Sequence, residues 1–367
     1  MIQRLQNIER LPLAMTKGDK FLQLPEDVIM EIFSRLPVKS LLRLKAVCKY
    51  WCALIHSPIF VAKHLHRQKN KQNLLVHRYH VHGGDSALSL FPDEYLAGTS
   101  QEYQDHIPTP TYFSAVLGPL DGIVFLYNDD HSMVLWNPAT REVKHLPPSV
   151  PSSSLSLYSH VFGFGKDPET NDFKVVYVRD YWDDDVEIWH VPLVSVYSLS
   201  TNSWRQFKDY TFSSLRVVKS YANTYSNGFY YWRDISNCKV FAFDLRNEVF
   251  LEIKTPDTFK SMQWNLGLYN DSLAIFVCNP SSNNASVDIW VMEAEQSWIK
   301  KVSINGPLLN IRRALGSWKT GDIFIETGTL QLALLNPSIM EIRNLGPRIN
   351  CYCLQVSSYK ESLIRLN

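Results

Sequence analysis

Two patterns of hydrophobic and polar positions divide the chain. Between residues 21 and 66, large apolar side chains recur every three or four positions, which predicts short helices. After a polar, basic stretch at residues 67–73, short apolar runs bounded by turn residues predict β-strands. The change of period marks a domain boundary. We predict an N-terminal extension at residues 1–20, a helical domain at residues 21–66 and a β-rich domain at residues 67–367.

The helical segment carries several start and stop signals. Pro25 suits a first helical position, because the N–H that proline lacks would have no partner there. Pro37 breaks that helix, and Ser40 can cap or start the next one. A third helix is expected across Cys48–Leu54. Ser57-Pro58 reads as an N-cap and a first helical residue, and so predicts a fourth helix.

This segment has more large apolar side chains than so small a unit can bury. A unit of fewer than about 60 residues folds only marginally on its own. Surplus apolar side chains on such a unit indicate a surface for a partner. We therefore expect the helical segment to bind another protein.

The same residues resemble the F-box, the helical module that docks on a Skp-type adaptor in SCF ubiquitin ligases. The resemblance is carried, in order, by Leu24 to Asp27, Ile32, Arg35 to Leu41, Val47 to Lys49 and Trp51. The core of an unrelated small helical domain is the alternative. The resemblance implies that ten residues face the adaptor or pack the module: Leu24, Pro25, Ile32, Leu36, Pro37, Leu41, Leu44, Val47, Cys48 and Trp51.

The β-rich segment repeats one pattern, in which an apolar strand, a turn and a second strand lead to a polar turn and a further strand. A period of roughly 45 to 60 residues with short strands is typical of β-propeller blades. Residues 351–366 are expected to pair with a hairpin near residues 74–91 and complete a sixth blade, because an open array leaves an unpaired edge. A β-sandwich is the alternative. The five repeats begin at Gly122, Phe173, Gly228, Leu273 and Asp322.

These repeats resemble the plant F-box-associated domains, which are similar to degenerate kelch-type propellers. The resemblance implies an α+β multidomain chain, in which a small helical F-box precedes an all-β, kelch-like propeller of six blades. Within that group the chain looks most like the S-locus F-box proteins of pollen. The markers are Trp136-Asn137-Pro138, Gly163-Phe164-Gly165, Tyr197-Ser198-Leu199 with Trp204, Gly228 to Trp232 and Tyr359 to Leu363.

Composition narrows the partners and the compartment. The formal net charge of +1 produces no strong positive potential that would attract nucleic acid. No apolar run approaches the roughly 20 residues that span a bilayer. Residues 1–20 lack the apolar run of a signal peptide, and Met15 is an alternative start. Six cysteines are too few for a disulfide scaffold. We expect a cytoplasmic protein, also in the nucleus, without nucleic-acid or membrane partners.

No pattern of catalytic or metal-binding residues stands out. The stretch Gly163–Asp167 lacks the spacing of a phosphate-binding loop. The histidines at 64, 66, 77, 80 and 82 have no carboxylates at ligand spacing, so surface or packing roles are favoured over metal binding. We expect no catalytic residues, metal or cofactor.

The resemblance implies a receptor that joins a cullin-RING scaffold through its adaptor and promotes transfer by proximity rather than by chemistry of its own. The protein target it holds would then be ubiquitinated and degraded. A propeller enzyme or carbohydrate-binding protein, and a scaffold outside the ligase system, are the alternatives.

One acidic stretch is a candidate for target binding. Residues 179–190 combine five carboxylates with two tryptophans and a tyrosine, and are expected to form a loop. Such a loop would attract a basic partner, which the S-locus resemblance makes a secreted-type ribonuclease (S-RNase) in pollen self-incompatibility. A receptor in defence or stress signalling is the alternative role, and a solvated hairpin is the alternative structure. The candidates are Asp180, Trp182, Asp183, Asp184, Asp185 and Glu187.

Overall fold

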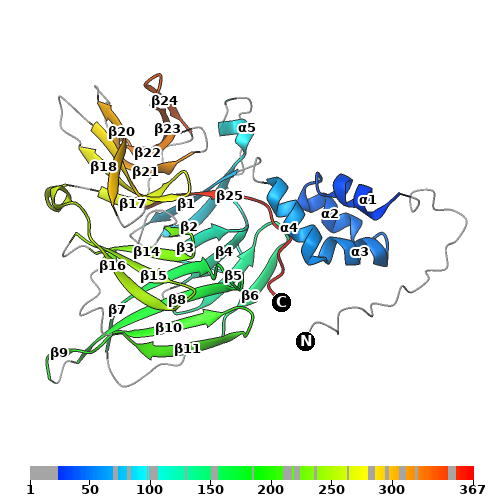
Figure 1. Cartoon of the computed structure of the whole chain (residues 1–367), viewed down its shortest axis with the longest axis horizontal. Coiled ribbons are helices and arrows are strands. Elements are labelled where there is room, and N and C mark those ends of the chain that lie inside the picture. The colour runs from blue at the N-terminus through cyan, green and yellow to red at the C-terminus, as the bar shows by residue number, and fades with distance from the viewer. Residues whose placement is uncertain are drawn as a thin grey trace, which may run out of the picture.

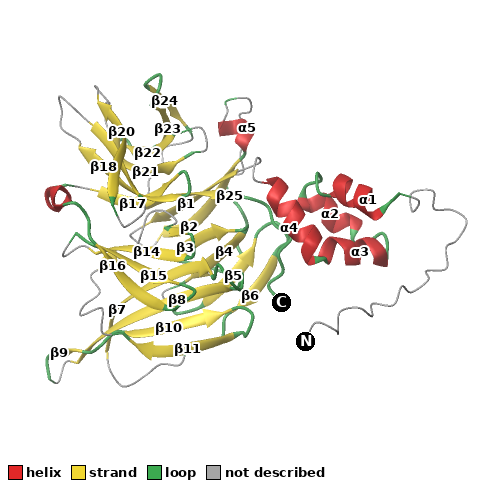
Figure 2. Cartoon of the chain, in the orientation of Figure 1, coloured by secondary structure: helices red, strands yellow, loops and turns green. Residues whose placement is uncertain are grey.

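The first four helices gather beside one end of a large β-domain (Figures 1 and 2). No helix in the described part of the chain is long and apolar enough to cross a membrane. The computed structural model describes residues 24–68, 73–80, 84–96, 98, 106–128, 130–149, 156–183, 186–209, 217–218, 224–234, 238–262, 264–279, 286–293, 297–305, 311–318, 321–345 and 353–367.

The helical module, residues 24–68, follows the predicted start signals with two corrections. Ser57 caps the last helix by accepting a hydrogen bond from the Phe60 N–H at 3.2 Å. Pro25 was predicted to be the first residue of the first helix but lies just before it. Ser40 was predicted to cap or start the second helix, which begins earlier, at Val38. In both cases the extended backbone of the preceding proline, Pro25 or Pro37, turns the chain into the helix. The helices are α1 (Glu26–Phe33), α2 (Val38–Leu44), α3 (Lys49–His56) and α4 (Pro58–Arg67).

A small apolar core and a group of ion pairs hold these helices together. Trp51 packs edge-on against Phe33, with ring centroids 5.0 Å apart. Glu31 in α1 pairs with Arg35, Arg67 and Lys63, which hold its pKa at about 2. The buried side chains of the core are Ile29, Phe33, Val38, Leu41, Leu54, Ile55, Phe60 and, from the far end of the chain, Leu363.

The β-domain is a six-bladed propeller, as the repeats predicted, and each blade is an antiparallel sheet. A short helix α5 (Asp93–Leu96) and a 3-10 turn η3 (Asp257–Ser261) lie between blades.

The first three blades follow one another along the chain. They are β3 (Ala115–Leu120), β4 (Ile123–Tyr127), β5 (Met133–Asn137) and β6 (Glu142–His145); β7 (Ser156–Lys166), β8 (Phe173–Asp183), β9 (Ile188–Trp189), β10 (Leu193–Ser198) and β11 (Ser203–Lys208); and β12 (Val217–Val218), β13 (Tyr225–Ser226), β14 (Phe229–Asp234), β15 (Val240–Asp244) and β16 (Val249–Ile253).

The last three blades include the one that joins both ends of the domain. They are β17 (Trp264–Tyr269), β18 (Ser272–Asn279), β19 (Ser286–Met292) and β20 (Trp298–Asn305); β21 (Ile311–Ser317), β22 (Ile323–Thr327), β23 (Leu332–Asn336) and β24 (Glu341–Asn344); and β25 (Cys353–Tyr359), β1 (Asn73–His80) and β2 (Gly84–Phe91).

The sixth blade closes the ring. β1 pairs with β25 in antiparallel register from Asn73 opposite Tyr359 to Tyr79 opposite Cys353, and β2 pairs with the other edge of β1. This confirms the predicted pairing of the C-terminal residues with the first hairpin. The prediction placed the strand end near Leu366, whereas the sheet ends at Tyr359 and residues 360–367 continue as an irregular tail.

A buried ion group joins the second blade to the third. The Lys174 ammonium lies 3.0 Å from Asp167 and 3.0 Å from Glu248, and donates to the Leu245 carbonyl at 2.7 Å. Burial disfavours the charge, but the hydrogen bonds to Asp167 and Glu248 outweigh it and raise the pKa of Lys174. Because each charge has a partner, the group fastens the β7–β8 turn to the neighbouring blade.

We expect Lys174→Met to lower the free energy of unfolding by about 3–5 kcal/mol, because it leaves Asp167 buried without its cation. Lys300→Met is the matched control. Its 2.8 Å pair with Asp288 is solvent-exposed, so the loss should stay below about 1 kcal/mol. Urea unfolding of both variants measures the difference, and equal losses would contradict the structural role of the buried group.

Candidate functional site

An apolar surface covers one side of the helical module. α1 buries Ile29 and Phe33 but leaves Val28 and Ile32 exposed, and Ile32 keeps 46% of its surface. Residues four apart lie one above another on a helix, so Val28 and Ile32 form a row, and the exposed Leu24 lies just before the start of the helix. An exposed apolar row beside a well-packed core is a feature of a protein-binding surface.

Most of the ten residues predicted to face the adaptor or pack the module are exposed or half-buried. Val47, which follows α2, is 62% exposed, and Pro25 and Pro37 are also exposed. Half-buried side chains at the edge of the module's core are Leu36, Leu44 and Trp51, and Cys48 is half-buried as well.

Leu41 differs from the other nine residues. It is fully buried in the core of the helical module, so it takes one of the packing positions that the resemblance implied. Helical spacing alone did not separate this inward position from the outward ones.

Two exposed residues of the module were absent from the sequence prediction. Val28 lies one helical turn before Ile32 on α1, and this spacing of four was the available signal. Ile59, in the first turn of α4, is 74% exposed. Since a resemblance transfers only positions that match a motif, it passed over both.

The acidic stretch forms the tip of an extended hairpin in the second blade. β8 runs beyond its partner β10, and its last residues pair instead with the short β9, with Trp182 opposite Trp189. The propeller places this tip at the end farthest from the helices (Figure 1). The hairpin therefore lengthens the second blade in the direction away from the helical module.

The six acidic-stretch candidates separate by burial. Asp180 is only 3% exposed and accepts a hydrogen bond from Ser159 at 3.3 Å, so its prediction as a contact residue is wrong. Trp182 is half-buried, Glu187 is exposed, and Asp183 accepts a hydrogen bond from the Val186 N–H at 3.3 Å. Asp184 and Asp185 lie outside the described residues.

The tip also presents apolar side chains that the sequence prediction missed. Tyr158 on β7 is 68% exposed, and Val186 and Ile188 beside the acidic residues are exposed as well. Tyr158 is distant from the acidic residues in the sequence, and the pairing of β7 with β8 brings it near them. The combination of exposed apolar groups and carboxylates suits a partner with basic and apolar side chains.

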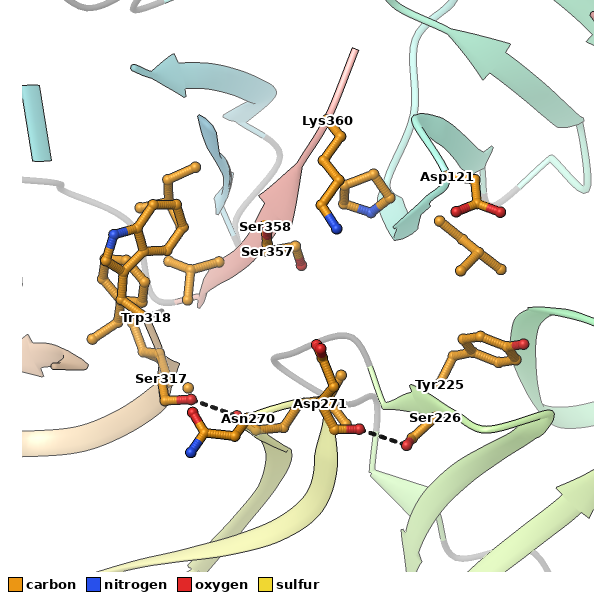
Figure 3. Close-up of a pocket in the computed structure, with 18 of the residues that line it drawn as sticks. Asp121, Tyr225, Ser226, Asn270, Asp271, Ser317, Trp318, Ser357, Ser358 and Lys360 are labelled. Atoms are coloured by element: carbon orange, nitrogen blue, oxygen red, sulfur yellow. Dashed lines mark hydrogen bonds between the residues drawn. The ribbon is translucent and has the colours of Figure 1, made fainter. Parts of the chain in front are cut away.

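A cavity of about 510 Å³ occupies the mouth of the central channel. It is lined by turns from several blades and by Lys360 of the C-terminal tail (Figure 3). Asp121 is paired with Lys166 at 2.8 Å, and Ser226 donates to the Asp271 carbonyl at 2.7 Å. These polar groups bind one another, and they do not form a nucleophile–base pair.

Of the histidines considered in the sequence, His64 and His77 are buried in packing positions and His66 is exposed, whereas the His80 side chain and His82 lie outside the described residues. His64 in α4 is buried, and its Nε2 atom lies 3.0 Å from the Leu36 carbonyl oxygen. Burial lowers the pKa of His77 to about 4. Across the described ranges, no three His, Cys, Asp or Glu side chains are grouped to hold a metal ion.

Comparison with known proteins agrees with this architecture. Residues 21–68 match the F-box-like family, and residues 68–329 match the family of the F-box associated beta propeller domain. The Arabidopsis thaliana F-box protein CPR1 is 26% identical over 77% of this chain and 73% of its own. F-box protein At3g07870 from the same plant is 27% identical over 88% and 87% of the two chains, and F-box/kelch-repeat protein At3g23880 is 28% identical over 77% and 80%.

The buried histidine gives a pH prediction. Above pH 6.5, the ordinary pKa of a histidine, His77 is neutral in both the folded and the unfolded chain. As the pH falls from 6.5 to 4, the unfolded chain takes up a proton that the folded chain refuses, so stability is lost by about 3 kcal/mol. We expect His77→Leu to remove this part of the pH dependence in urea unfolding. An unchanged pH profile would show that His77 does not carry it.

Proposed function

The chain belongs to the plant F-box proteins with an F-box-associated β-propeller domain, and from this membership we propose that it is the substrate-recognition subunit of an SCF ubiquitin ligase. F-box proteins are typically non-catalytic substrate adaptors of SCF complexes. An F-box joined to a propeller fits that role, because one domain can bind the Skp-type adaptor while the other holds a target. The cullin-RING scaffold then joins through the adaptor.

The exposed apolar row on the F-box carries the proposal. Leu24, Val28 and Ile32 remain exposed on a module that already has a complete core, and Val47 extends the apolar surface beyond α2. Covering exposed apolar surface stabilises a complex by roughly 25 cal/mol per Å² before the costs of association. An adaptor with an apolar groove is the partner that this surface suits.

The arrangement of the two candidate surfaces also supports a receptor role. The F-box lies at one end of the propeller, and the β8–β9 tip lies at the other (Figure 1). Adaptor and target would therefore bind without competing for the same face. A receptor of this kind accelerates transfer by holding the target near the conjugating enzyme.

For the target, we propose a protein with a basic surface that meets the β8–β9 tip. Carboxylates at the tip would raise the rate of encounter, and Tyr158, Val186 and Ile188 would provide apolar contacts. The S-locus resemblance makes this target a basic S-RNase, which would be met in the cytoplasm of the pollen tube. That assignment depends on the resemblance, and binding of such a ribonuclease tests it.

Ile32→Asp and Val47→Asp are each expected to weaken binding of a Skp-type adaptor at least tenfold, because each places a charge in an apolar contact. Leu251→Asp is the matched control: Leu251 is an exposed leucine on the outer strand β16 of the propeller. Calorimetric titration with purified adaptor measures the affinities. Wild-type affinity in both F-box variants would refute the F-box interface.

Neutralising Asp184, Asp185 and Glu187 to their amides should slow association with a basic S-RNase and flatten its dependence on salt, because long-range attraction is screened by ions. The control carries Glu252→Gln, Glu293→Gln and Glu341→Gln, which remove the same charge from other blades. Stopped-flow association at several salt concentrations gives the rates. If both triple variants slow equally, net charge rather than the tip is responsible.

A further inference from the structure

The last eight residues leave the propeller and run to the F-box. β25 ends at Tyr359, and residues 360–367 continue from the sheet toward the helices (Figure 1). On the way they lie against the β3–β4 turn at Gly122. A Cβ atom at Gly122 would come within 2.4 Å of the Ser362 Cβ and 2.6 Å of the Lys360 carbonyl oxygen. This close approach, together with a φ of +82°, explains glycine at that turn.

The first blade holds this tail through one asparagine. The Asn137 side-chain amide donates to the Ser362 carbonyl at 3.0 Å and to the Ile364 carbonyl at 2.9 Å. Its oxygen accepts from the Ala139 N–H at 3.1 Å within its own turn. Asn137 and Ser362 are both fully buried, so these bonds are shielded from water.

The tail then contributes to both cores. Leu363 is 2% exposed and completes the core of the F-box, and Leu366 is buried as part of the apolar core that extends over the first three blades. Between them and the sheet, the Glu361 carboxylate accepts a hydrogen bond from the Val38 N–H at 3.1 Å, where α2 begins without a side-chain cap of its own. One segment therefore packs into the helical module and into the propeller.

This segment is a second connection between the two domains, and Ala139 of the first blade also packs against the helical core beside it. The backbone joins α4 to β1 through residues 69–72, and a single covalent link does not by itself fix the angle between two domains. Rotating the F-box about that link would pull Leu363 out of the helical core or break the bonds at Asn137. Packed cores resist such changes, so the tail favours one orientation.

We propose that residues 360–367 form a strut that fixes the F-box relative to the propeller, with Asn137, Glu361, Leu363 and Leu366 as its positioning residues. Resting on the proposed receptor function, the strut would determine where a bound target lies relative to the conjugating enzyme. It would thereby decide which target lysines receive ubiquitin. The strut would contact neither the adaptor nor the target.

Two variants release the tail from opposite sides. Leu363→Ala acts in the F-box core, whereas the double variant Asn137→Ala with Leu366→Ala acts on the propeller side and leaves the helical core intact. Leu345→Ala is the control, because Leu345 is equally buried but packs between the fifth and sixth blades. Circular dichroism and urea unfolding confirm that each chain is folded.

The distance between domains gives the direct test. Spin labels at positions 43 on α2 and 208 on β11, both exposed, report the distance between F-box and propeller in the full chain. We expect one narrow distribution in the wild type and the control, and a broadened distribution with longer distances in both tail variants. A narrow, wild-type distribution in the propeller-side variant overturns the strut.

A second measurement separates the strut from the receptor function. In a reconstituted ligase, the chain's own lysines serve as acceptors, and mass spectrometry identifies those that are modified. We expect the tail variants to bind the adaptor with wild-type affinity but to modify a wider set of lysines, and an unchanged set overturns the positioning role. If the wild type fails to bind the adaptor, the proposed function is wrong, and the spin-label distances still decide the strut.

Discussion

Pairing of the first and last strands within one blade is the constraint on which the whole architecture depends. β1 follows directly on the F-box, and β25 lies beside it as the inner strand of the sixth blade. The pairing hides the strand edges of an otherwise open array. It also returns the C-terminus to the place where the chain entered the propeller. For this reason Glu361 can reach Val38, although the two residues are 323 positions apart.

Antiparallel blades place successive connections on opposite faces of the propeller. The end of β5, at Asn137, meets the C-terminal tail on the face that bears the F-box. The β8–β9 connection lies on the other face, where the hairpin projects beyond the blade. The propeller thus separates the apolar surface of the F-box from the acidic tip, and a receptor that acts by proximity requires such a separation.

Local signals predicted much of this structure, and their failures share a cause. Asn137-Pro138 and the other repeated turns identified the blades, and the cap at Ser57 was correct. Asp180 was predicted to be a contact residue because carboxylates are usually exposed. The sequence does not show that Ser159 on the adjacent strand donates a hydrogen bond to it. The resemblance did not separate adaptor-facing from packing positions, and helical spacing does not tell which face meets the core, so only the structure assigns Leu41 to the core.

The sequence by itself determined the two-domain order, the start of the last F-box helix, the repeated blades and the apolar residues of the F-box, because these depend on periodicity and on chemistry within a few residues. Tertiary structure alone decided which of those residues face outward, how Tyr158 joins the acidic tip and where Leu363 packs. Each of these depends on contacts between residues far apart in the chain, whose partners are set by strand register and ring closure rather than by local pattern.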